Sequence, residues 1–316
     1  MWSFGWCESR PRPGRRPGRG ARALVAAGIA AVLAGAPAAD EASREGVLEG
    51  ERVAPTSGLA PCSARLEPVQ LEVAASDEPD DAASVAAIRR LYGAERWFGV
   101  AENVRVREDA GPGSPVLRVS YPKGSASFSL SRRGRPLGGA SFYAPFARAG
   151  EVSAVCLRYQ VRFPRGFDFV RGGKLPGLYA GKAPSGGEEV TGRNGWSVRL
   201  MWREGGEGEL YEYVVNKPGK HGLRVGKGAF RFETGRWISV DLELVPNEVG
   251  ERDGRARLWI DGGAVIEQDG IVFRTAESRS EIGLMFSTFF GGNDESWATT
   301  KDEHVDFSGF RVFVAR

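Results

Sequence analysis

The sequence has few residues of the kind that hold metal ions, and it lacks several motifs that mark common enzyme classes. Its 316 residues include two histidines, His221 and His304, and three cysteines. These form neither an HExxH nor a CxxC arrangement, so we expect no catalytic metal. A GxSxG turn and a P-loop are also missing, and we expect no organic cofactor. Because of the acidic pairs Asp294–Glu295 and Asp302–Glu303, the sequence leaves open whether a structural calcium ion binds.

Long apolar runs are missing too, apart from one near the N-terminus. The run Ala23–Ala39 follows six arginines within residues 10–22 and ends in the small residues Ala-Pro-Ala-Ala. This order predicts a secretory signal peptide over residues 1–39 and a secreted or periplasmic protein. The run has 17 residues, fewer than the roughly 20 that a membrane-spanning helix needs. We therefore expect no stable membrane association once the leader is removed.

The net positive charge of the chain comes from the leader, and one internal segment also has a local excess of basic residues. The whole chain has a formal charge of +3, whereas residues 40–316 contain 37 basic and 39 acidic residues. This balance excludes the broad positive field of a nucleic-acid-binding protein. Residues 171–231 contain 11 lysines and arginines against six glutamates, which suits an anionic polymer. We expect a monomer with such a polymer as its partner and no nucleic acid.

Cysteine usage leaves one question open. Cys7 lies in the predicted leader, so Cys62 and Cys156 remain in the mature chain. An exported protein can keep a disulfide, which here would tie the N-terminal segment to the domain. Two free buried thiols are equally compatible with the spacing.

Two regions follow the leader. Residues 40–90 are rich in Ala, Ser, Pro, Asp and Glu and predict a linker or poorly ordered arm, with a short helix at residues 86–92. Residues 91–316 predict one all-β domain, because many short strand-like segments are separated by Gly, Pro and Asn or Asp. The expected fold is a two-sheet sandwich of the jelly-roll or concanavalin-like type. The predicted strands are 104–107, 116–121, 125–130, 140–145, 152–163, 197–203, 210–215, 236–244, 255–260, 264–268, 282–290 and 305–314.

Two segments show strand patterns that have structural roles only. Residues 235–246 alternate, and their predicted core residues are Ile238, Val240, Leu242 and Leu244. The dipeptide Asp261-Gly262 at the end of a strand predicts a tight hairpin turn.

The segment from residue 171 to 217 carries the most chemistry. Two predicted strands, 196–203 and 209–215, flank a turn rich in Gly and Glu. Because side chains alternate along a strand, one shared face carries Ser197, Arg199, Met201, Tyr211 and Tyr213. The turn predicts a pairing of Arg203 with Glu209, which places Arg199 opposite Tyr213. Met201 then lies opposite Tyr211, and Lys174 precedes both strands in a GGKLPG segment that we predict to be a turn.

These segments carry a family resemblance. GGKLPGLYAG, WSVRLMW and GELYEY resemble polysaccharide lyase family 14, which includes alginate lyases and other glucuronate-polymer lyases. The run MFSTFFGGNDESWATTKDEHVDFSGFRV resembles the same family, and the similarity extends from Pro115 to Arg316. No segment is specific alone, but all four occur in order. The resemblance implies a β-jelly roll, an anionic polysaccharide substrate and functional positions at Lys174, Ser197, Arg199, Tyr211 and Tyr213.

The chemistry of a uronate lyase accounts for these residue types. β-Elimination requires that the carboxylate be neutralised, that a base take the C5 proton and that an acid protonate the O4 leaving group. Arg199 suits the carboxylate, because a guanidinium can form two parallel hydrogen bonds with it. Lys174 adds positive charge, and Tyr211 and Tyr213 are the acid and base candidates, in either order. Ser197 is expected to orient the substrate.

Each of these residues alone also has an ordinary structural explanation. Tyrosine favours strands, and an arginine on a strand often pairs with a glutamate across a hairpin. Four more residues are predicted to contact the substrate: Lys217, His221, Asn293 and Trp297. The first two lie in the KPGKHG loop after the tyrosine strand and could simply be solvated. The other two lie in a C-terminal Gly-Asn turn, where an aromatic ring can stack on a sugar.

Two other functions stay open. A non-catalytic carbohydrate-binding protein would use the same fold, because fold does not fix function. A glycoside hydrolase needs two facing carboxylates, for which Asp241 and Glu243 are the nearest candidates. The sequence identifies neither the uronate polymer nor endo or exo action.

Overall fold

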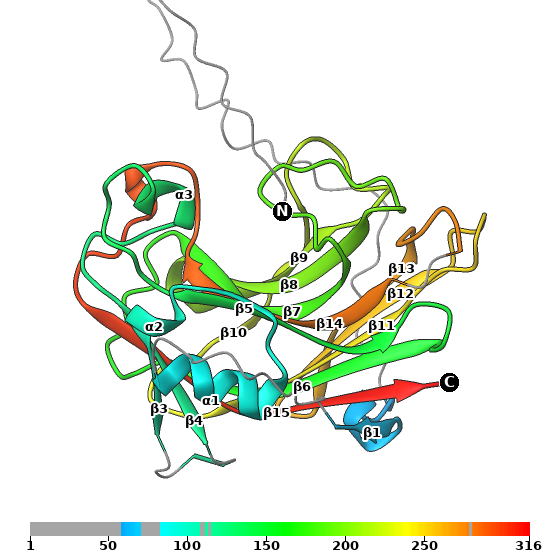
Figure 1. Cartoon of the computed structure of the whole chain (residues 1–316), viewed down its shortest axis with the longest axis horizontal. Helices are drawn as coiled ribbons and strands as arrows, with labels where there is room; N and C mark the ends of the chain where they lie inside the picture. The colour runs from blue at the N-terminus through cyan, green and yellow to red at the C-terminus, as the bar shows by residue number, and fades with distance from the viewer. Residues whose placement is uncertain (1–57, 71–82, 108–110, 113–114, 278–279) are drawn as a thin grey trace, which may run out of the picture. The chain divides into compact units, whose positions relative to one another are not determined.

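Two antiparallel β-sheets face each other across a continuous apolar core (Figure 1). The computed structural model describes residues 58–70, 83–107, 111–112, 115–277 and 280–316. These residues belong to the unit Arg44–Arg316. The all-β sandwich predicted from the sequence is confirmed, whereas the predicted signal peptide, residues 1–39, lies outside the described residues. Within the described ranges, no helix has the length and apolar character to cross a membrane.

The sheet that carries the predicted site is called the front sheet. Its strands are, in spatial order, β10 (Leu223–Arg231), β9 (Glu207–Tyr213), β8 (Gly195–Arg203), β7 (Gly172–Gly181), β14 (Glu281–Phe290), β5 (Ala140–Arg148) and β2 (Arg96–Phe98). The three strands that contain the family motifs, β7, β8 and β9, are therefore direct neighbours.

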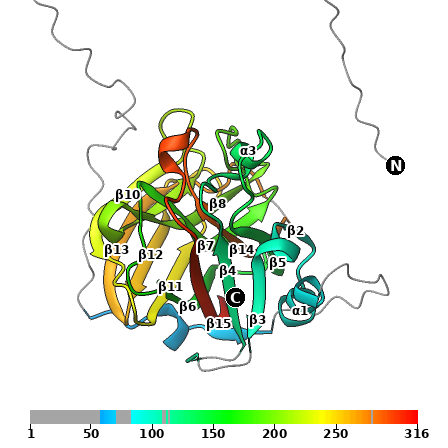
Figure 2. The same cartoon turned by 90° about the vertical axis from the view of Figure 1, so that its left-hand side faces the viewer.

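The back sheet packs behind it. Its strands are, in spatial order, β13 (Gly263–Ile271), β12 (Gly254–Ile260), β11 (Ile238–Val245), β6 (Ala154–Arg162), β15 (Glu303–Ala315), β4 (Val116–Tyr121) and β3 (Val104–Arg107), and β1 (Glu67–Val69) also pairs with β15. The described helices are α1 (Ala83–Tyr92), α2 (Val100–Asn103) and α3 (Phe128–Ser131), with 3₁₀ turns η2 (Cys62–Ala64), η3 (Glu204–Gly206) and η4 (Glu295–Trp297). Helix α1 lies at the side where β2 and β3 end the two sheets (Figure 2).

Strand alternation decides which side chains fill the core. In β8, Val198, Leu200 and Trp202 point inward and are fully buried, so the residues between them face outward. The predicted core residues of β11 are all fully buried and confirm that prediction: Ile238, Val240, Leu242 and Leu244. Between β12 and β13, Asp261 and Gly262 have φ values of +50° and +81°, as a two-residue hairpin turn requires.

The GGKLPG segment is part of a strand and not a turn. It was predicted to be a turn, but it forms the first part of β7 in the middle of the front sheet. Nearly all of β7 is buried, and its first part has the glycines and the proline that usually mark turns and are rare inside strands. Pro176 has no N–H to pair, and the ladder shifts register between Leu175 and Gly177 to accommodate it.

Two other elements also differ from the prediction. The segment predicted as a strand at 125–130 contains helix α3, where Ser131 Oγ donates to the carbonyl of Phe128 at 2.9 Å. Serines make such local hydrogen bonds in place of ladder bonds. Strand β10 was not predicted, because Gly226 and Gly228 interrupt its pattern; both have positive φ values, at an irregularity in the ladder.

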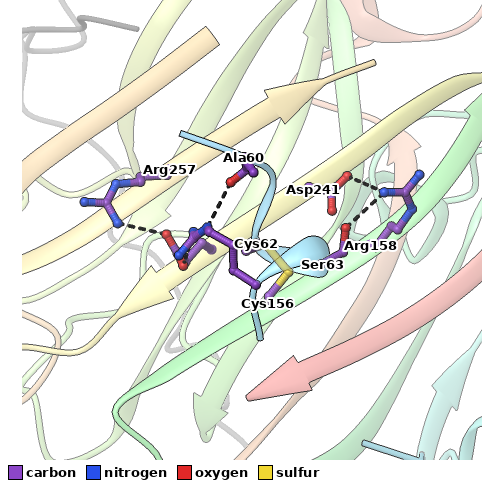
Figure 3. The surroundings of a disulfide bond; sticks show 9 residues. Ala60, Cys62, Ser63, Cys156, Arg158, Asp241 and Arg257 are labelled. Carbon is purple, nitrogen blue, oxygen red and sulfur yellow. Dashed lines mark hydrogen bonds and ion pairs between the residues drawn. A yellow bond between two sulfur atoms is a disulfide. The ribbon is translucent and has the colours of Figure 1, made fainter. Parts of the chain in front are cut away.

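The N-terminal segment is partly ordered. Cys62 and Cys156 form a disulfide that ties η2 to β6 (Figure 3). Trp259 Nε1 donates to the carbonyl of Leu59 at 3.0 Å, and β1 extends the back sheet. The linker or poorly ordered arm predicted over residues 40–90 stays a prediction; within it the structure describes residues 58–70 and 83–90, which contain η2, β1 and most of α1. Residues 40–57 and 71–82 of that arm lie outside the described ranges.

Candidate active site

The predicted site residues gather on the outer face of the front sheet. Strands β8 and β9 pair with Arg199 opposite Tyr211 and Ser197 opposite Tyr213. The predicted register was wrong by two residues, since Met201 lies opposite Glu209. The Arg203 side chain does contact Glu209, but diagonally, because the last residue pair of the β8–β9 ladder is Trp202 with Gly208. A shift of two keeps every side chain on its face, so the predicted shared face is the observed one.

Lys174 reaches this face from β7. Its Nζ lies 2.6 Å from the sulfur of Met201, its neighbour across the β7–β8 ladder. The same Nζ is 3.4 Å from the centroid of the Tyr211 ring, a close cation–π contact. The side chain is 9% exposed, so this positive charge lies within the site and close to the phenol.

The two tyrosines are held by backbone N–H groups. The hydroxyl of Tyr211 accepts a hydrogen bond from Gly222 N at 3.1 Å, and that of Tyr213 accepts one from Gly187 N at 2.9 Å. Their ring centroids are 5.7 Å apart in an edge-on arrangement. Gly222 fits between the rings, because a Cβ there would lie 2.8 Å from both. Each phenol oxygen is thus held in place by a backbone donor.

Arg199 lies beside them in a desolvated position. It is 3% exposed, and its Nε has no hydrogen-bond partner within the described part of the chain. Burial lowers the pKa of Arg199, while the phenols of Tyr143, Tyr211 and Tyr213 act in the opposite direction. A buried guanidinium without a carboxylate is costly, so the position is suited to an anionic ligand. Gly177, its cross-strand neighbour, leaves no side chain beside it.

Ser197 is placed differently from the other predicted residues. It is fully buried, and its Oγ donates to the carbonyl of Pro184 at 2.6 Å. Pro184 and Gly187 belong to residues 182–194, which we call the covering loop. Because Ser197 and Tyr213 both bond to this loop, it borders the site at one end of β8 and β9.

Lys217 and His221 lie in the loop that follows β9. Lys217 Nζ is 5.4 Å from the Tyr213 ring centroid and donates to the carbonyls of Gly219 and Lys220. Burial lowers the pKa of Lys217. His221 is half-buried and directly precedes Gly222, the residue between the two tyrosine rings. Both predicted residues therefore border the tyrosine pair.

Trp297 lies at the other end of the strands. Its ring is half-buried between the guanidinium carbons of Arg171 and Arg203, at 4.9 and 5.7 Å from the centroid. It packs on Gly292, where a Cβ would collide with the ring at 2.2 Å. Asn293 is exposed, and its carbonyl accepts from Arg133 at 3.4 Å. Trp297 thus borders the front face, whereas the structure shows no bond from the Asn293 side chain to the tyrosines within the described residues.

Two groups on this face, Tyr143 and Glu209, were not among the predicted site residues, although a pairing of Glu209 with Arg203 was predicted. Tyr143 of β5 lies in the same cross-strand row as Arg199, through Met285 and Gly177. The β5 segment shows only the strand pattern, and nothing local links it to a motif more than 50 residues away. Glu209 is fully buried and accepts hydrogen bonds from Arg203 at 2.6 Å and from Arg224 at 3.2 Å.

The carboxylates considered for a hydrolase lie on the other sheet. Asp241 pairs with Arg158 at 3.2 Å, and Glu243 pairs with Arg65 and Arg257 at 2.7 and 2.9 Å (Figure 3). Both are fully or almost fully buried beside the disulfide. They are held in ion pairs, which disfavours a role as a catalytic acid and nucleophile.

The acidic loop pairs are also engaged by protein groups. Asp294 accepts from the N–H of Ser296, and Asp302 accepts from the N–H of Lys123. Glu303 accepts from the N–H of Asp168 at 2.8 Å. These bonds give the carboxylates structural roles in turns.

Comparisons with known proteins agree with this geometry. The family model described as Polysaccharide lyase 14 matches residues 109–310. A PL-14 alginate lyase from Aplysia kurodai is similar in structure, with 28% identity, a TM-score of 0.60 and coverage of 79% of this chain and 97% of that chain. Alginate lyase Aly36B (23% identity, TM-score 0.58, coverage 79% and 97%) and alginate lyase vAL-1 from Chlorella virus (22%, 0.57, 70% and 92%) share the fold. No curated protein sequence matches the chain significantly.

Proposed function

Because the chain belongs to polysaccharide lyase family 14, we infer that it cleaves a uronate polymer of the alginate or glucuronan type by β-elimination. The observation that carries the choice of substrate is the buried guanidinium of Arg199, which lacks an ion-pair partner among the described residues. A uronate carboxylate would supply that partner in two parallel hydrogen bonds. Similarity to an alginate lyase from Aplysia kurodai supports the same substrate class.

In the proposed reaction, neutralising the carboxylate makes the C5 proton of the sugar acidic enough to remove. One of the two phenols, Tyr211 or Tyr213, takes this proton in its ionised form. The electron pair forms the C4–C5 double bond, the bond from C4 to the glycosidic oxygen breaks, and a phenol returns a proton to that oxygen. Lys174 and Arg199 stabilise the negative charge that develops on the carboxylate and the phenol. The bond count balances without an oxidant or a second substrate.

The other predicted residues are assigned to substrate binding according to where they lie around the tyrosine pair. Ser197 holds the covering loop over Tyr213, and we propose that it orients the substrate through this loop. Lys217 and His221 would contact sugars beside the tyrosine pair, and Trp297 would stack on a sugar at the Arg203 end. Asn293 remains a predicted contact for a sugar beyond Trp297.

The test is the ultraviolet absorbance of the unsaturated uronate product. Residues 40–316 would be incubated separately with alginate, glucuronan and pectate. A rise on one polymer is the expected result and also names the substrate. If no polymer gives a rise while retardation in polymer-containing gels shows binding, the protein binds carbohydrate without cleaving it.

We also propose that the protein is exported, with residues 1–39 as the signal peptide. The Cys62–Cys156 disulfide supports this, because disulfides persist mainly in oxidising compartments. Expression in a bacterial host, followed by fractionation and N-terminal sequencing, tests the proposal. A mature N-terminus near Asp40 is expected, and an uncleaved chain in the cytoplasm would contradict it.

A further inference from the structure

The front face extends beyond the proposed catalytic residues toward β5 and β2. Arg96 of β2 is the register partner of Tyr143 of β5, so both side chains face outward. The Arg96 guanidinium carbon lies 4.2 Å from the Tyr143 ring centroid and 5.9 Å from the Tyr179 ring centroid. The two rings meet edge-on with centroids 5.3 Å apart. One arginine and two phenols therefore form a compact group, which we call the Arg96 cluster.

Tyr179 connects this cluster to the catalytic residues. It is the cross-strand neighbour of Ser197, and its ring lies over Gly283, where a Cβ would come within 2.6 Å of it. Burial raises the pKa of Tyr179 to about 12, and Arg96 acts in the opposite direction. Tyr143 lies in the same row as Arg199, three strands away, so their Cα atoms are about 14 Å apart at the usual spacing of paired strands. The two side chains still interact, because the Tyr143 phenol acts on the pKa of Arg199.

The borders of the site indicate which way a polymer runs. Along the strands, the covering loop closes one end at Ser197 and Tyr213, and Trp297 with its loop stands at the other end. A chain bound at Arg199 is thus directed across the strands. On one side the next strands are β7, β14, β5 and β2, which lead to Arg96.

Arg96 has the properties of a second carboxylate contact. It is exposed, and it forms no ion pair within the part of the chain that the structure describes. Its guanidinium is held against the Tyr143 ring, so less side-chain freedom is lost when it binds an anion. Every sugar of a polyuronate carries a carboxylate, so a chain held at Arg199 presents others on both sides. Arg96 also precedes residues 109–310, the part matched by the family model.

We propose that Arg96, Tyr143 and Tyr179 form a distal subsite that binds a further uronate of the same polymer, Arg96 taking its carboxylate and the Tyr143 ring its sugar face. This inference rests on the proposed function for the identity of the ligand. The subsite contributes to binding of long chains and does not touch the reacting atoms. It therefore affects KM for polymer more than kcat.

The test compares Arg96→Ala with wild type on whichever of alginate, glucuronan and pectate is cleaved, as polymer and as size-graded oligosaccharides. Loss of one charged contact is expected to raise KM for the polymer about fivefold to tenfold, with kcat changed less than about twofold. KM for the shortest cleaved oligosaccharide should stay the same. Arg96→Lys should restore part of the loss. An unchanged KM for polymer, or an equal rise for every chain length, would overturn the subsite.

A matched control lies on the same strand. Arg89 of α1 packs on Trp97, the next residue of β2, with its guanidinium carbon 5.6 Å from the ring centroid. Trp97 points to the opposite face from Arg96, so Arg89→Ala removes a similar contact away from the site. Its KM should match that of wild type. Tyr143→Ala, which removes the ring that holds the Arg96 guanidinium, should resemble Arg96→Ala.

Gel retardation separates failure of the subsite from failure of the proposed function. Wild type and Arg96→Ala would be run through gels that contain alginate or glucuronan. If wild type cleaves the polymer and Arg96→Ala behaves like wild type in both assays, the subsite is rejected and the lyase activity is retained. Retardation that depends on Arg96, without any cleavage, keeps a uronate-binding subsite and removes the lyase. If the protein shows no cleavage and no retardation, both the lyase and the subsite are overturned.

Discussion

The ammonium group of Lys174 lies over the ring of Tyr211, with Nζ 3.4 Å from the ring centroid. A positive charge in this position stabilises negative charge on the phenol when the tyrosine loses its proton. Lys174 reaches it from β7, while Tyr211 is on β9, so the pair spans the intervening strand β8. This contact leads to the first prediction.

Lys174→Ala should lower kcat about 100-fold or more, because the developing charge loses its nearest ammonium group. KM should change less. Lys123→Ala is the control and should behave as wild type, because Lys123 is an exposed lysine in the turn that follows β4 of the back sheet. A Lys174 variant that keeps its kcat while remaining folded by circular dichroism would remove Lys174 from the proposed chemistry.

Tyr211→Phe and Tyr213→Phe should each lower kcat by roughly 100- to 10,000-fold, the usual contribution of general acid–base catalysis. Only a hydroxyl is lost, so the melting temperature should change little. Tyr92→Phe is the matched control and should keep full activity, because Tyr92 is the last residue of α1 and is buried in the core. Wild-type rates in both site variants would contradict the acid and base roles.

Arg199→Ala should reduce turnover much more on a fully charged polyuronate than on the same polymer with methyl-esterified carboxylates. The reason is that the ester no longer presents an anion to the guanidinium. Arg199→Lys should recover little, because an ammonium group cannot bind a carboxylate in two parallel bonds. Equal losses on both polymers, measured as kcat/KM, would argue against the carboxylate clamp.

Acid should weaken the back sheet at Asp306. Burial alone would raise the pKa of this carboxyl, but hydrogen bonds from Arg118 and Arg162 outweigh it and leave the pKa below its usual value. The stabilisation is therefore complete above the unfolded pKa, near 4, and is lost as the pH falls through the lower folded pKa. Asp306→Asn should cost about 1–2 kcal/mol at neutral pH, and the difference should close in acid.

The measurement for Asp306 is the melting temperature of both proteins as a function of pH. Asp269→Asn, which breaks an exposed pair with Arg255, should show almost no difference at any pH. A constant gap between wild type and Asp306→Asn down to pH 2 would show that ionisation of Asp306 is not responsible.

The disulfide should contribute stability without contributing to catalysis. Its cysteines are 94 residues apart, and replacing both with serine should cost about 2–5 kcal/mol, because the unfolded chain regains the freedom of a long loop. The bond lies on the back sheet (Figure 3), whereas Tyr211 and Arg199 belong to the front sheet, so kcat at low temperature should be retained. A loss of kcat in a protein that is still folded would show that the N-terminal segment influences the front face.

The fold was predictable where polar and apolar residues alternate along a strand. β8, β11 and β12 alternate in this way, and Asp261-Gly262 is a typical hairpin turn sequence. The first part of β7 was missed because its sequence, GGKLPG, contains the glycines and the proline that usually mark a turn. The disulfide could not be decided, because its partners approach only after β6 and the N-terminal segment have packed together.

For the candidate site, the sequence predicted which face of the sheet carries the residues, but not how β8 and β9 pair. Because side chains alternate, sliding β9 along β8 by an even number of residues leaves Arg199 and the two tyrosines on the same face. The position of Tyr143 depends on the strand order β8-β7-β14-β5, and no local pattern encodes a strand order. Likewise, the hydrogen bond from Ser197 to the covering loop depends on where that loop folds, which strand alternation does not encode.

Glu209 has a mechanical consequence for the site. It lies on β9 and binds Arg203 of β8 and Arg224 of β10, so a single carboxylate joins three adjacent strands. If any of these strands slid along its neighbour, a fully buried charge would lose a partner. The carboxylate therefore resists shear in the sheet. The spacing between Arg199 on one strand and the two phenols on the next is thereby locked before a polymer arrives.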